Sequence, residues 1–240
     1  MRVTRRLVPV IPAVLLVALL LVLPGCRTTF IRRGVERRVE KRLADLLGPA
    51  EHYRVRIRET RDPELALGRA RRVEIDGQRI LAKGQFLIDS LRLTLIDLRY
   101  EGGAPSFLSV RRSDLDVEFT DTALNSYLKA YHARYEPDFR FEAGVVHAQM
   151  TYKFLGSPTP IRAAGRLVVR EGRQLLFDAD TADVSFVDDP AFAERFVEDR
   201  VNPILDLSRI EFPARLDSVE VLQGRIRAHG SAALPREARD

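Results

Sequence analysis

The sequence predicts an α+β fold in which a curved, mostly antiparallel sheet wraps around an N-terminal amphipathic helix, with two further short helices. Three observations predict this class. Apolar residues recur at helical spacing just after residue 26, and from Tyr53 onward they alternate with polar residues. In addition, no helix of about ten to fifteen residues separates each neighbouring pair of strands, which disfavours a doubly wound parallel sheet.

The composition allows a sizeable core and excludes several classes of protein. The chain has 240 residues, of which 45% are hydrophobic and 30% are charged, so it can fold rather than stay disordered. Its net charge of +5 falls close to balance once Arg2, Arg5 and Arg6 are set aside, which argues against a nucleic-acid-binding protein. The single cysteine excludes an intrachain disulfide and a cysteine-based zinc cluster, and the four histidines lack metal-ligand spacing.

The first 26 residues have the features of a lipoprotein signal. A basic start precedes an uncharged apolar run over residues 7–23, and Leu23-Pro24-Gly25-Cys26 follows. This tetrad resembles the bacterial lipobox, whose cysteine is lipidated and becomes the mature N-terminus. We therefore expect lipid attachment at Cys26 to hold the protein on a membrane. An ordinary signal peptide and an uncleaved anchor are the alternatives, because 17 apolar residues reach the lower limit for a membrane span.

These features predict the organisation of the chain and its location. Residues 1–25 are expected to be the signal peptide, residues 26–234 a single domain, and residues 235–240 a tail. The expected location is the bacterial cell envelope, with the domain outside the cytoplasm. Whether the anchor lies in the inner or the outer membrane stays open.

A basic amphipathic helix is predicted directly after Cys26. Thr28 or Thr29 can cap it and Gly48-Pro49 can end it. Its apolar stripe consists of Ile31, Val35, Val39, Leu43 and Leu46, and its other sides carry Arg32, Arg33, Arg37, Arg38, Lys41 and Arg42, offset by Glu36, Glu40 and Asp45. We expect the stripe to pack on the sheet. The basic residues are either merely solvated or lie against anionic lipid headgroups.

The period-two segments predict the strands in chain order. The alternating apolar positions are Tyr53, Val55 and Ile57; Val73 and Ile75; Leu91, Leu93 and Leu95; Leu115, Val117 and Phe119; Phe139 and Phe141; Val146, Ala148, Met150, Tyr152 and Phe154; Ile161, Ala163, Gly165, Leu167 and Val169; and Ala182, Val184 and Phe186. The alternation slips at Ile96, which predicts a bulge. Asp76-Gly77 and Ala143-Gly144 predict turns.

Two short helices and a closing hairpin complete the predicted fold. Thr120 or Asp121 can cap a helix whose apolar side holds Leu124, Tyr127, Leu128 and Tyr131. Pro190 opens a second helix with Phe192, Phe196 and Val197 on one face, and Asn202-Pro203 ends it. The segment from Val219 to Ala228, with a turn at Gln223-Gly224, predicts a hairpin.

Motifs of catalysis are lacking, so we expect no enzyme, no catalytic residue, no cofactor and no metal. The sequence has no Gly-rich phosphate loop, no G-x-S-x-G elbow and no H-E-x-x-H pair. The acid pair Asp188-Asp189 directly precedes Pro190, where helix capping is the simplest explanation. His147 alternates with apolar neighbours and is expected to face solvent.

Two segments resemble a known family. FTDTALNSYL at 119–128 is similar to a helix start of the LmeA-like phospholipid-binding family, and VNPILDL at 201–207 with Phe212-Pro213 and the final hairpin resembles its C-terminal end. The resemblance covers roughly residues 30–234. It implies an envelope protein that binds phospholipid, with a fold similar to the tubular lipid-binding domains. The strongly basic first helix departs from the family, and no catalytic residue is carried over.

The strand faces suggest where a lipid would bind. They carry more bulky apolar area than a short helix covers, which predicts an apolar groove between the sheet and its helices. The groove-lining residues are expected to be Val39, Leu43, Phe141, Met150, Tyr152, Phe154, Leu167 and Val169. Headgroups are expected to meet basic side chains at the mouth of the groove, either from the helix that carries Arg32 to Arg42 or from Arg54, Arg56 and Arg58.

Three functions are compatible with the sequence. The first is an envelope lipoprotein that binds membrane phospholipid and either holds or transfers it, with no nucleic acid as partner. The second is a structural lipoprotein that docks a protein partner and holds no lipid. The third is an enzyme acting on an envelope lipid or glycan, which would need distant polar residues to converge in a cleft.

Overall fold

The computed structural model describes residues 24–83, 85–100, 107–131, 137–209 and 214–232, with side chains of the first helix from Arg32 onward. The expected signal peptide lies outside these residues except for its last two positions, as does the expected tail. Cys26 lies in the first turns of a helix, but its side chain is outside the described part. The fold is α+β with mostly antiparallel strands in curled sheets, which confirms the predicted class.

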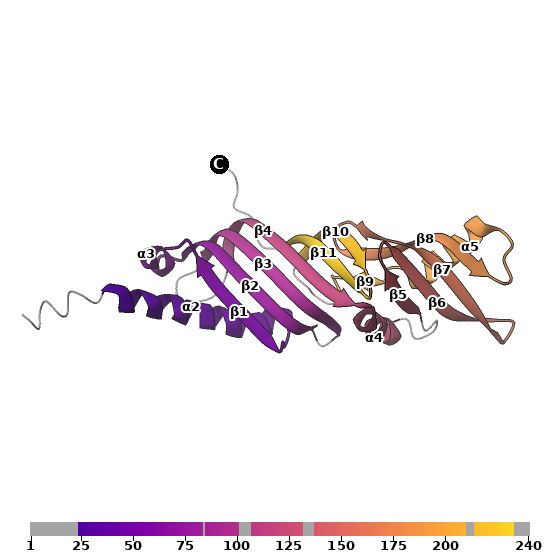
Figure 1. The fold of residues 1–240 in the computed structure, drawn as a ribbon, viewed down its shortest axis with the longest axis horizontal. Coiled ribbons are helices and arrows are strands. Elements are labelled where there is room, and N and C mark those ends of the chain that lie inside the picture. The colour runs from indigo at the N-terminus through magenta and orange to yellow at the C-terminus, as the bar shows by residue number, and fades with distance from the viewer. Residues whose placement is uncertain (1–23, 84, 101–106, 132–136, 210–213, 233–240) are drawn as a thin grey trace, which may run out of the picture.

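Eleven strands of the described chain form two sheets (Figure 1). The first sheet has the order β1-β2-β3-β4-β11-β10, and the second has the order β5-β6-β7-β8-β9. The strands are β1 (His52–Arg58), β2 (Arg69–Ala82), β3 (Phe86–Tyr100), β4 (Phe107–Thr120), β5 (Asp138–Glu142), β6 (Val145–Phe154), β7 (Ser157–Arg170), β8 (Gln174–Val184), β9 (Leu205–Asp206), β10 (Ala214–Leu222) and β11 (Arg225–Ala232). All their pairings are antiparallel.

Four helices accompany the sheets: α2 (Pro24–Leu47), α3 (Asp62–Ala66), α4 (Asp121–Tyr131) and α5 (Pro190–Val201). In Figure 1, α2 and α3 lie at one end of the elongated molecule, α4 lies near the middle, and α5 lies at the opposite end. The short helix α3 was not expected from the sequence. It begins with Asp62-Pro63, a helix-start signal, but five residues are too few for an apolar period to be recognised.

The apolar stripe of α2 packs as predicted from Val35 onward, with a correction at its C-terminal end, and the Ile31 side chain lies outside the described part. Thr28 and Thr29 lie inside α2, so the predicted cap is wrong. Val35 and Val39 are half-buried and Leu43 is 4% exposed, but Leu46 is 45% exposed and Leu47, at 7%, takes its place. Steps of four residues therefore hold the stripe against β1 to the end of the helix. Gly48 ends α2 at φ +113°, and a Cβ there would lie 2.1 Å from the Leu81 carbonyl oxygen, so only glycine fits.

The predicted turn at Asp76-Gly77 is wrong, because β2 continues through it. Gly77 pairs with Tyr53 across β1 and β2, and a Cβ on the glycine would lie 3.1 Å from the Tyr53 ring. The glycine therefore makes room for an aromatic side chain on the neighbouring strand rather than for a turn. The phenol of Tyr53 donates a 2.8 Å hydrogen bond to the Gly48 carbonyl, and burial raises its pKa to about 12.

The predicted irregularity after Leu95 is present, but it is not a one-strand bulge. Asp97 has φ +51°, and the buried face of β3 changes from Leu95 to Leu98. The pairing register of β3 with β2 and with β4 is nevertheless the same on both sides of Asp97. No extra residue is inserted at Asp97, and the buried faces of β2 and β4 change side close to the facing positions, Arg71 and Arg111. The register of β3 with β4 shifts later, between Arg99 and Tyr100.

The two sheets adjoin where their hairpin turns meet. The Gly224 N–H donates to the Phe141 carbonyl at 2.9 Å, and the Gly144 N–H donates to the Val221 carbonyl at 3.0 Å. A further hydrogen bond between the sheets runs from the Leu216 N–H of β10 to the carbonyl of Gly172, which lies between β7 and β8. One continuous cluster of buried apolar residues, from Leu43 to Ala228, runs through both sheets. A chain that starts at residue 27 therefore keeps the whole described core.

Candidate functional site

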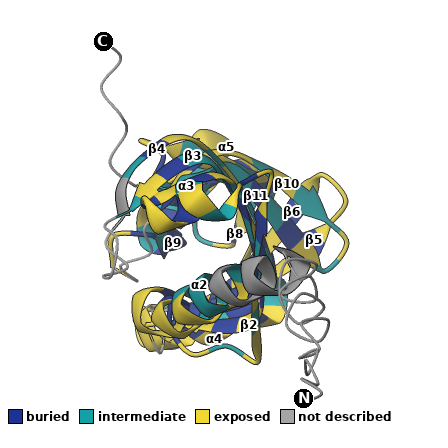
Figure 2. Cartoon of the chain, turned by 90° about the vertical axis from the view of Figure 1, so that its left-hand side faces the viewer, coloured by how far each residue is buried: buried dark blue, intermediate teal, exposed yellow. Residues whose placement is uncertain are grey.

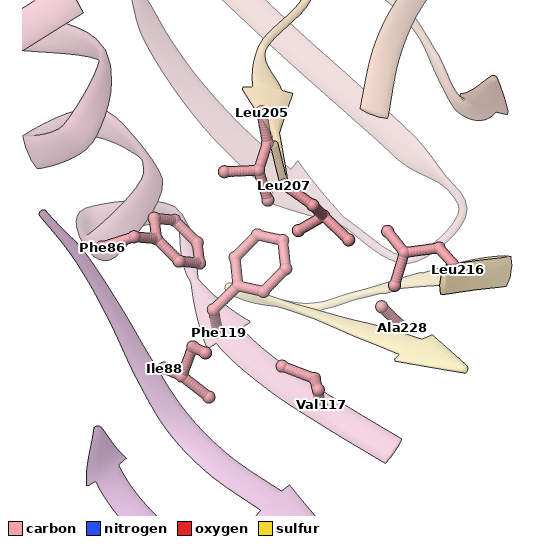
Figure 3. A pocket seen from close by; sticks show the side chains of 8 residues that line it. All are labelled: Phe86, Ile88, Val117, Phe119, Leu205, Leu207, Leu216 and Ala228. Carbon is pink, nitrogen blue, oxygen red and sulfur yellow. The ribbon is translucent and has the colours of Figure 1, made fainter. Parts of the chain in front are cut away.

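An apolar cavity lies where the two sheets meet. Its eight lining residues are all apolar, and their side chains converge from both sheets (Figure 3): Phe86 and Ile88 of β3, Val117 and Phe119 of β4, Leu216 of β10, Ala228 of β11, and Leu205 and Leu207 in and after β9. We call it the junction cavity. Segments more than 100 residues apart build it, since β11 pairs with β4 and β9 comes from the other sheet.

Helix α4 supplies the aromatic wall beside the junction cavity. The Phe86 ring lies edge-on to Phe119, with centroids 5.0 Å apart, and edge-on to Tyr127 of α4 at 5.6 Å. The Tyr127 ring in turn lies 4.5 Å from that of Tyr131. Burial raises the pKa of the Tyr127 phenol, so this wall is neutral over the physiological range. The surroundings of the cavity therefore favour an apolar occupant.

The junction cavity is small in this conformation. Its volume is about 20 Å³, little more than the room that one water molecule needs. An acyl chain therefore requires the two sheets, or α4 and the sheets, to move apart. Each sheet is internally hydrogen-bonded, whereas few hydrogen bonds join them, so the junction is the place where separation breaks the fewest.

The structure places the expected groove residues in two separate groups. Val39 and Leu43 lie between α2 and the first sheet, whereas the others lie in the second sheet: Phe141, Met150, Tyr152, Phe154, Leu167 and Val169. Phe141 and Met150 are buried, and Phe154 is 40% exposed. None of the eight lines the junction cavity. The alternation of apolar residues indicated which side of each strand faces inward, but it could not show which strands pack against each other.

The expected headgroup residues lie along α2, and one of them is engaged by the fold. Arg33, Arg37, Arg38, Lys41 and Arg42 are exposed. Arg32 is half-buried, and its Nη2 donates a 2.8 Å hydrogen bond to the Thr60 carbonyl and lies 4.0 Å from Asp62 Oδ1. The exposed five form a basic face that can meet phosphate groups.

Glu36 and Glu40 have a role that the sequence analysis missed. They face β1, the outer strand of the first sheet, and accept hydrogen bonds at 3.0 Å from the Ile57 and Val55 backbone N–H groups. One helical turn between the two carboxylates matches the spacing of two N–H groups on one strand edge. Helix α2 thus closes the edge of the sheet with its acids, while its arginines face elsewhere.

An aromatic cluster occupies the α5 end of the molecule. Its rings belong to Tyr152, Phe154, Phe186, Phe192 and Phe196. Phe154 stacks on Phe186 with centroids 4.3 Å apart, and the Arg200 guanidinium lies 3.3 Å from the Phe196 ring centroid. Phe192 was expected on the same face of α5 as the buried Phe196 and Val197, but it is 51% exposed.

The two asparagines in the resemblance motifs are structural. Asn125 of α4 accepts from the Phe139 N–H at 2.8 Å and donates to the Phe139 carbonyl at 2.8 Å. Asn202 makes the same two hydrogen bonds to Phe177: it accepts from the N–H and donates to the carbonyl, both at 2.7 Å. Each side-chain amide therefore replaces a missing strand partner. The rings of Phe139 and Phe177 pack edge-on with centroids 5.7 Å apart.

The described residues offer no site for metal chemistry. Within that part of the chain, no group of three or more His, Cys, Asp or Glu side chains could hold a metal ion. Asp189 caps α5, as expected, by accepting from the Ala191 N–H at 3.0 Å. His147 lies on the outer face of β6, 3.5 Å from Glu142. Among the helices described, none is both long enough and apolar enough to cross a membrane.

Comparison with known proteins gives one match. The model of a family described as LmeA-like phospholipid-binding matches residues 27–231. No curated protein and no solved structure gave a significant match to the chain. The matched range contains α3, α4, α5, both sheets and most of α2.

Proposed function

Because this chain belongs to the LmeA-like phospholipid-binding family, we propose that it binds phospholipid by admitting acyl chains at the junction cavity. The observation that supports this site is the lining, since eight apolar side chains from two sheets converge there without a polar group. Family membership supplies the ligand class, and the cavity supplies a place for its tails. Opening the seam between the sheets enlarges the cavity into a groove.

We further propose that the protein is a lipoprotein of the bacterial envelope. Lipid on Cys26 would hold it at a membrane, with the domain outside the cytoplasm. The basic face of α2, from Arg33 to Arg42, follows Cys26 along one helix and would meet anionic headgroups beside the anchor. Replacing Cys26 with serine should release the protein from membranes, and retention of an uncleaved Cys26→Ser protein would identify an ordinary anchor instead.

The test of lipid binding uses protein that starts at residue 27, which keeps the whole described core. It should take up fluorescent phospholipid from vesicles, and organic extraction of freshly purified protein should release phospholipid for mass spectrometry. Uptake should be faster from anionic than from zwitterionic vesicles and should weaken with salt, because exposed charges are screened within about 8 Å at physiological ionic strength. Delivery to acceptor vesicles in the same assay separates transfer from storage.

A pair of matched variants tests the junction cavity itself. Leu207→Ala removes a lining side chain, whereas Leu98→Ala removes an equally buried leucine from β3 outside the lining. Both changes should cost about 2–5 kcal/mol of stability. Only Leu207→Ala should change the rate or the extent of lipid uptake, because only it enlarges the proposed entry. Equal effects of the two variants on uptake would place the lipid elsewhere.

A second candidate is a structural envelope lipoprotein that docks a partner without holding lipid. The small volume of the junction cavity favours this alternative, because a packed interior has no room for acyl chains. Absence of extracted phospholipid together with no uptake from any vesicle would support it. An enzyme acting on an envelope lipid or glycan is the third hypothesis, and among the described residues no group of three or more His, Cys, Asp or Glu side chains could hold a metal ion for it.

A further inference from the structure

The end of the molecule next to α3 presents an exposed leucine among arginines. Leu67, at the C-terminal end of α3, is 75% exposed, and Gly68 follows with φ +74°. Figure 2 looks at this end, where the largely exposed α3 lies in front of the strands and near the N-terminal part of α2. We call the surface formed by Arg61, Leu67 and Arg69 the α3 foot.

The α3 foot carries an excess of positive charge. Residues 58–72 contain five arginines and three acids, and two of these arginines, Arg58 and Arg72, pair with Glu74 at 3.6 and 3.0 Å. One of the acids, Glu64, is bound by Arg71 at 2.8 Å, and this contact lowers the pKa of Glu64. Arg61 and Arg69 are exposed and form no ion pair within the described part of the chain.

The position of the α3 foot relative to the N-terminus suggests its partner. Arg32 of α2 contacts Thr60 and Asp62 immediately before α3. Cys26 precedes Arg32 by six helical residues, or about 9 Å along the helix axis. The headgroup layer of a bilayer leaflet is itself about 5–8 Å thick. A lipid-anchored Cys26 would therefore hold the α3 foot at the depth of the phosphate groups.

We propose that the α3 foot is a membrane-contact surface for anionic phospholipid, separate from the basic face of α2. This proposal rests on the proposed function only in taking a phospholipid bilayer as the partner. Leu67 inserts between headgroups, and the guanidinium groups of Arg61 and Arg69 bind lipid phosphates. An exposed apolar side chain flanked by cations has the composition of a membrane-interface contact.

The opposite end is the competing surface. There Leu155 is 91% exposed at the turn between β6 and β7, and Phe192 of α5 is 51% exposed. Residues 151–160 around that turn contain a single charge, Lys153, so they offer little attraction to anionic headgroups. The α3 foot has both the charge and the short path to Cys26, and we therefore assign the membrane contact to it.

The test is co-sedimentation of protein that starts at residue 27 with vesicles of phosphatidylglycerol and phosphatidylcholine, or of phosphatidylcholine alone. Wild-type protein should bind the anionic vesicles better. Arg61→Gln with Arg69→Gln should weaken that binding by about fivefold for each arginine, and Leu67→Ser by about tenfold. The controls are Leu155→Ser and the pair Arg162→Gln with Arg195→Gln, exposed residues of the second sheet and α5, which should bind as wild type. Thermal melts should show that all these surface variants fold.

Each outcome decides between the surfaces. Wild-type binding by the Leu67 and arginine variants overturns the proposal, and so does absence of vesicle binding by the wild type. Weakened binding by Leu155→Ser in place of Leu67→Ser assigns the contact to the α5 end. The phospholipid extracted from the same proteins is measured in parallel. Vesicle binding through the α3 foot without extracted lipid would contradict the proposed lipid-binding function while supporting this membrane contact.

Discussion

Replacing both Glu36 and Glu40 with alanine should leave two backbone N–H groups on the outer edge of the first sheet without acceptors. Their carboxylates accept hydrogen bonds from the backbone N–H groups of Ile57 and Val55, residues that are 4% and 3% exposed. Helix α2 covers this edge, so water has poor access to the two donors once the carboxylates are gone. An unsatisfied buried donor costs about 1–3 kcal/mol, and the double variant should therefore lose about 2–6 kcal/mol of unfolding free energy.

The loss is measured by thermal or urea unfolding of protein that starts at residue 27. For a chain of this size, each kcal/mol shifts Tm by about 2–4 °C, so the double variant should melt about 4–24 °C below wild type. Glu36→Gln with Glu40→Gln keeps an amide oxygen as acceptor and should recover about half of the loss.

The control for the edge experiment is Asp45→Ala. Asp45 lies on the same helix, but it is exposed and makes none of the contacts with β1 described above. Its replacement should change stability by less than about 0.5 kcal/mol. The reasoning is refuted if the double variant at Glu36 and Glu40 is as stable as Asp45→Ala, because the strand edge would then be satisfied by solvent.

Three further predictions concern the fold. Asn125→Ala and Asn202→Ala should each lower the free energy of unfolding in urea by about 2–4 kcal/mol, because each leaves the backbone N–H and carbonyl of a buried phenylalanine without a hydrogen-bond partner. A loss below about 0.5 kcal/mol would contradict the assigned role. Val39→Asp should lose about 1–3 kcal/mol by placing an unpaired carboxylate against the sheet, whereas Arg38→Asp should melt near wild type; equal melts would show that the stripe does not pack. The pKa of Tyr53 is raised from an ordinary 10 to about 12, so between these pH values only the unfolded chain releases the phenol proton. The free energy of unfolding should therefore fall as pH rises through this window, and Tyr53→Phe should flatten the fall. An unchanged pH profile in the variant would disprove the assignment.

The predicted strand faces agree with the structure because strand periodicity is a local property. Val146, Ala148 and Met150 are buried while His147 and Gln149 are exposed, as their alternation indicates. Turn and cap signals are equally local, and Thr120 and Asp189 cap the two helices that they were expected to cap. One of the errors arose where a residue type serves two purposes. Gly77 indicated a turn, but in the structure it makes room for the Tyr53 ring.

The sequence by itself determined the fold class, the order of most elements, the inward faces and the resemblance to a phospholipid-binding family that the family match confirms. Only the tertiary structure decided which inward faces meet. Pairing of β11 with β4 brings Arg227 to Glu118, 109 residues earlier in the chain, and the same closure builds the junction cavity from both sheets. The alternation of apolar residues indicates that a side chain is buried, but not which side chains it packs against. Those neighbours depend on the pairing of strands that are far apart in the sequence. The roles of Glu36, Glu40, Asn125 and Asn202 also depend on the tertiary structure, because each is bonded to backbone 14 to 25 residues away that lies beside it only in the folded chain.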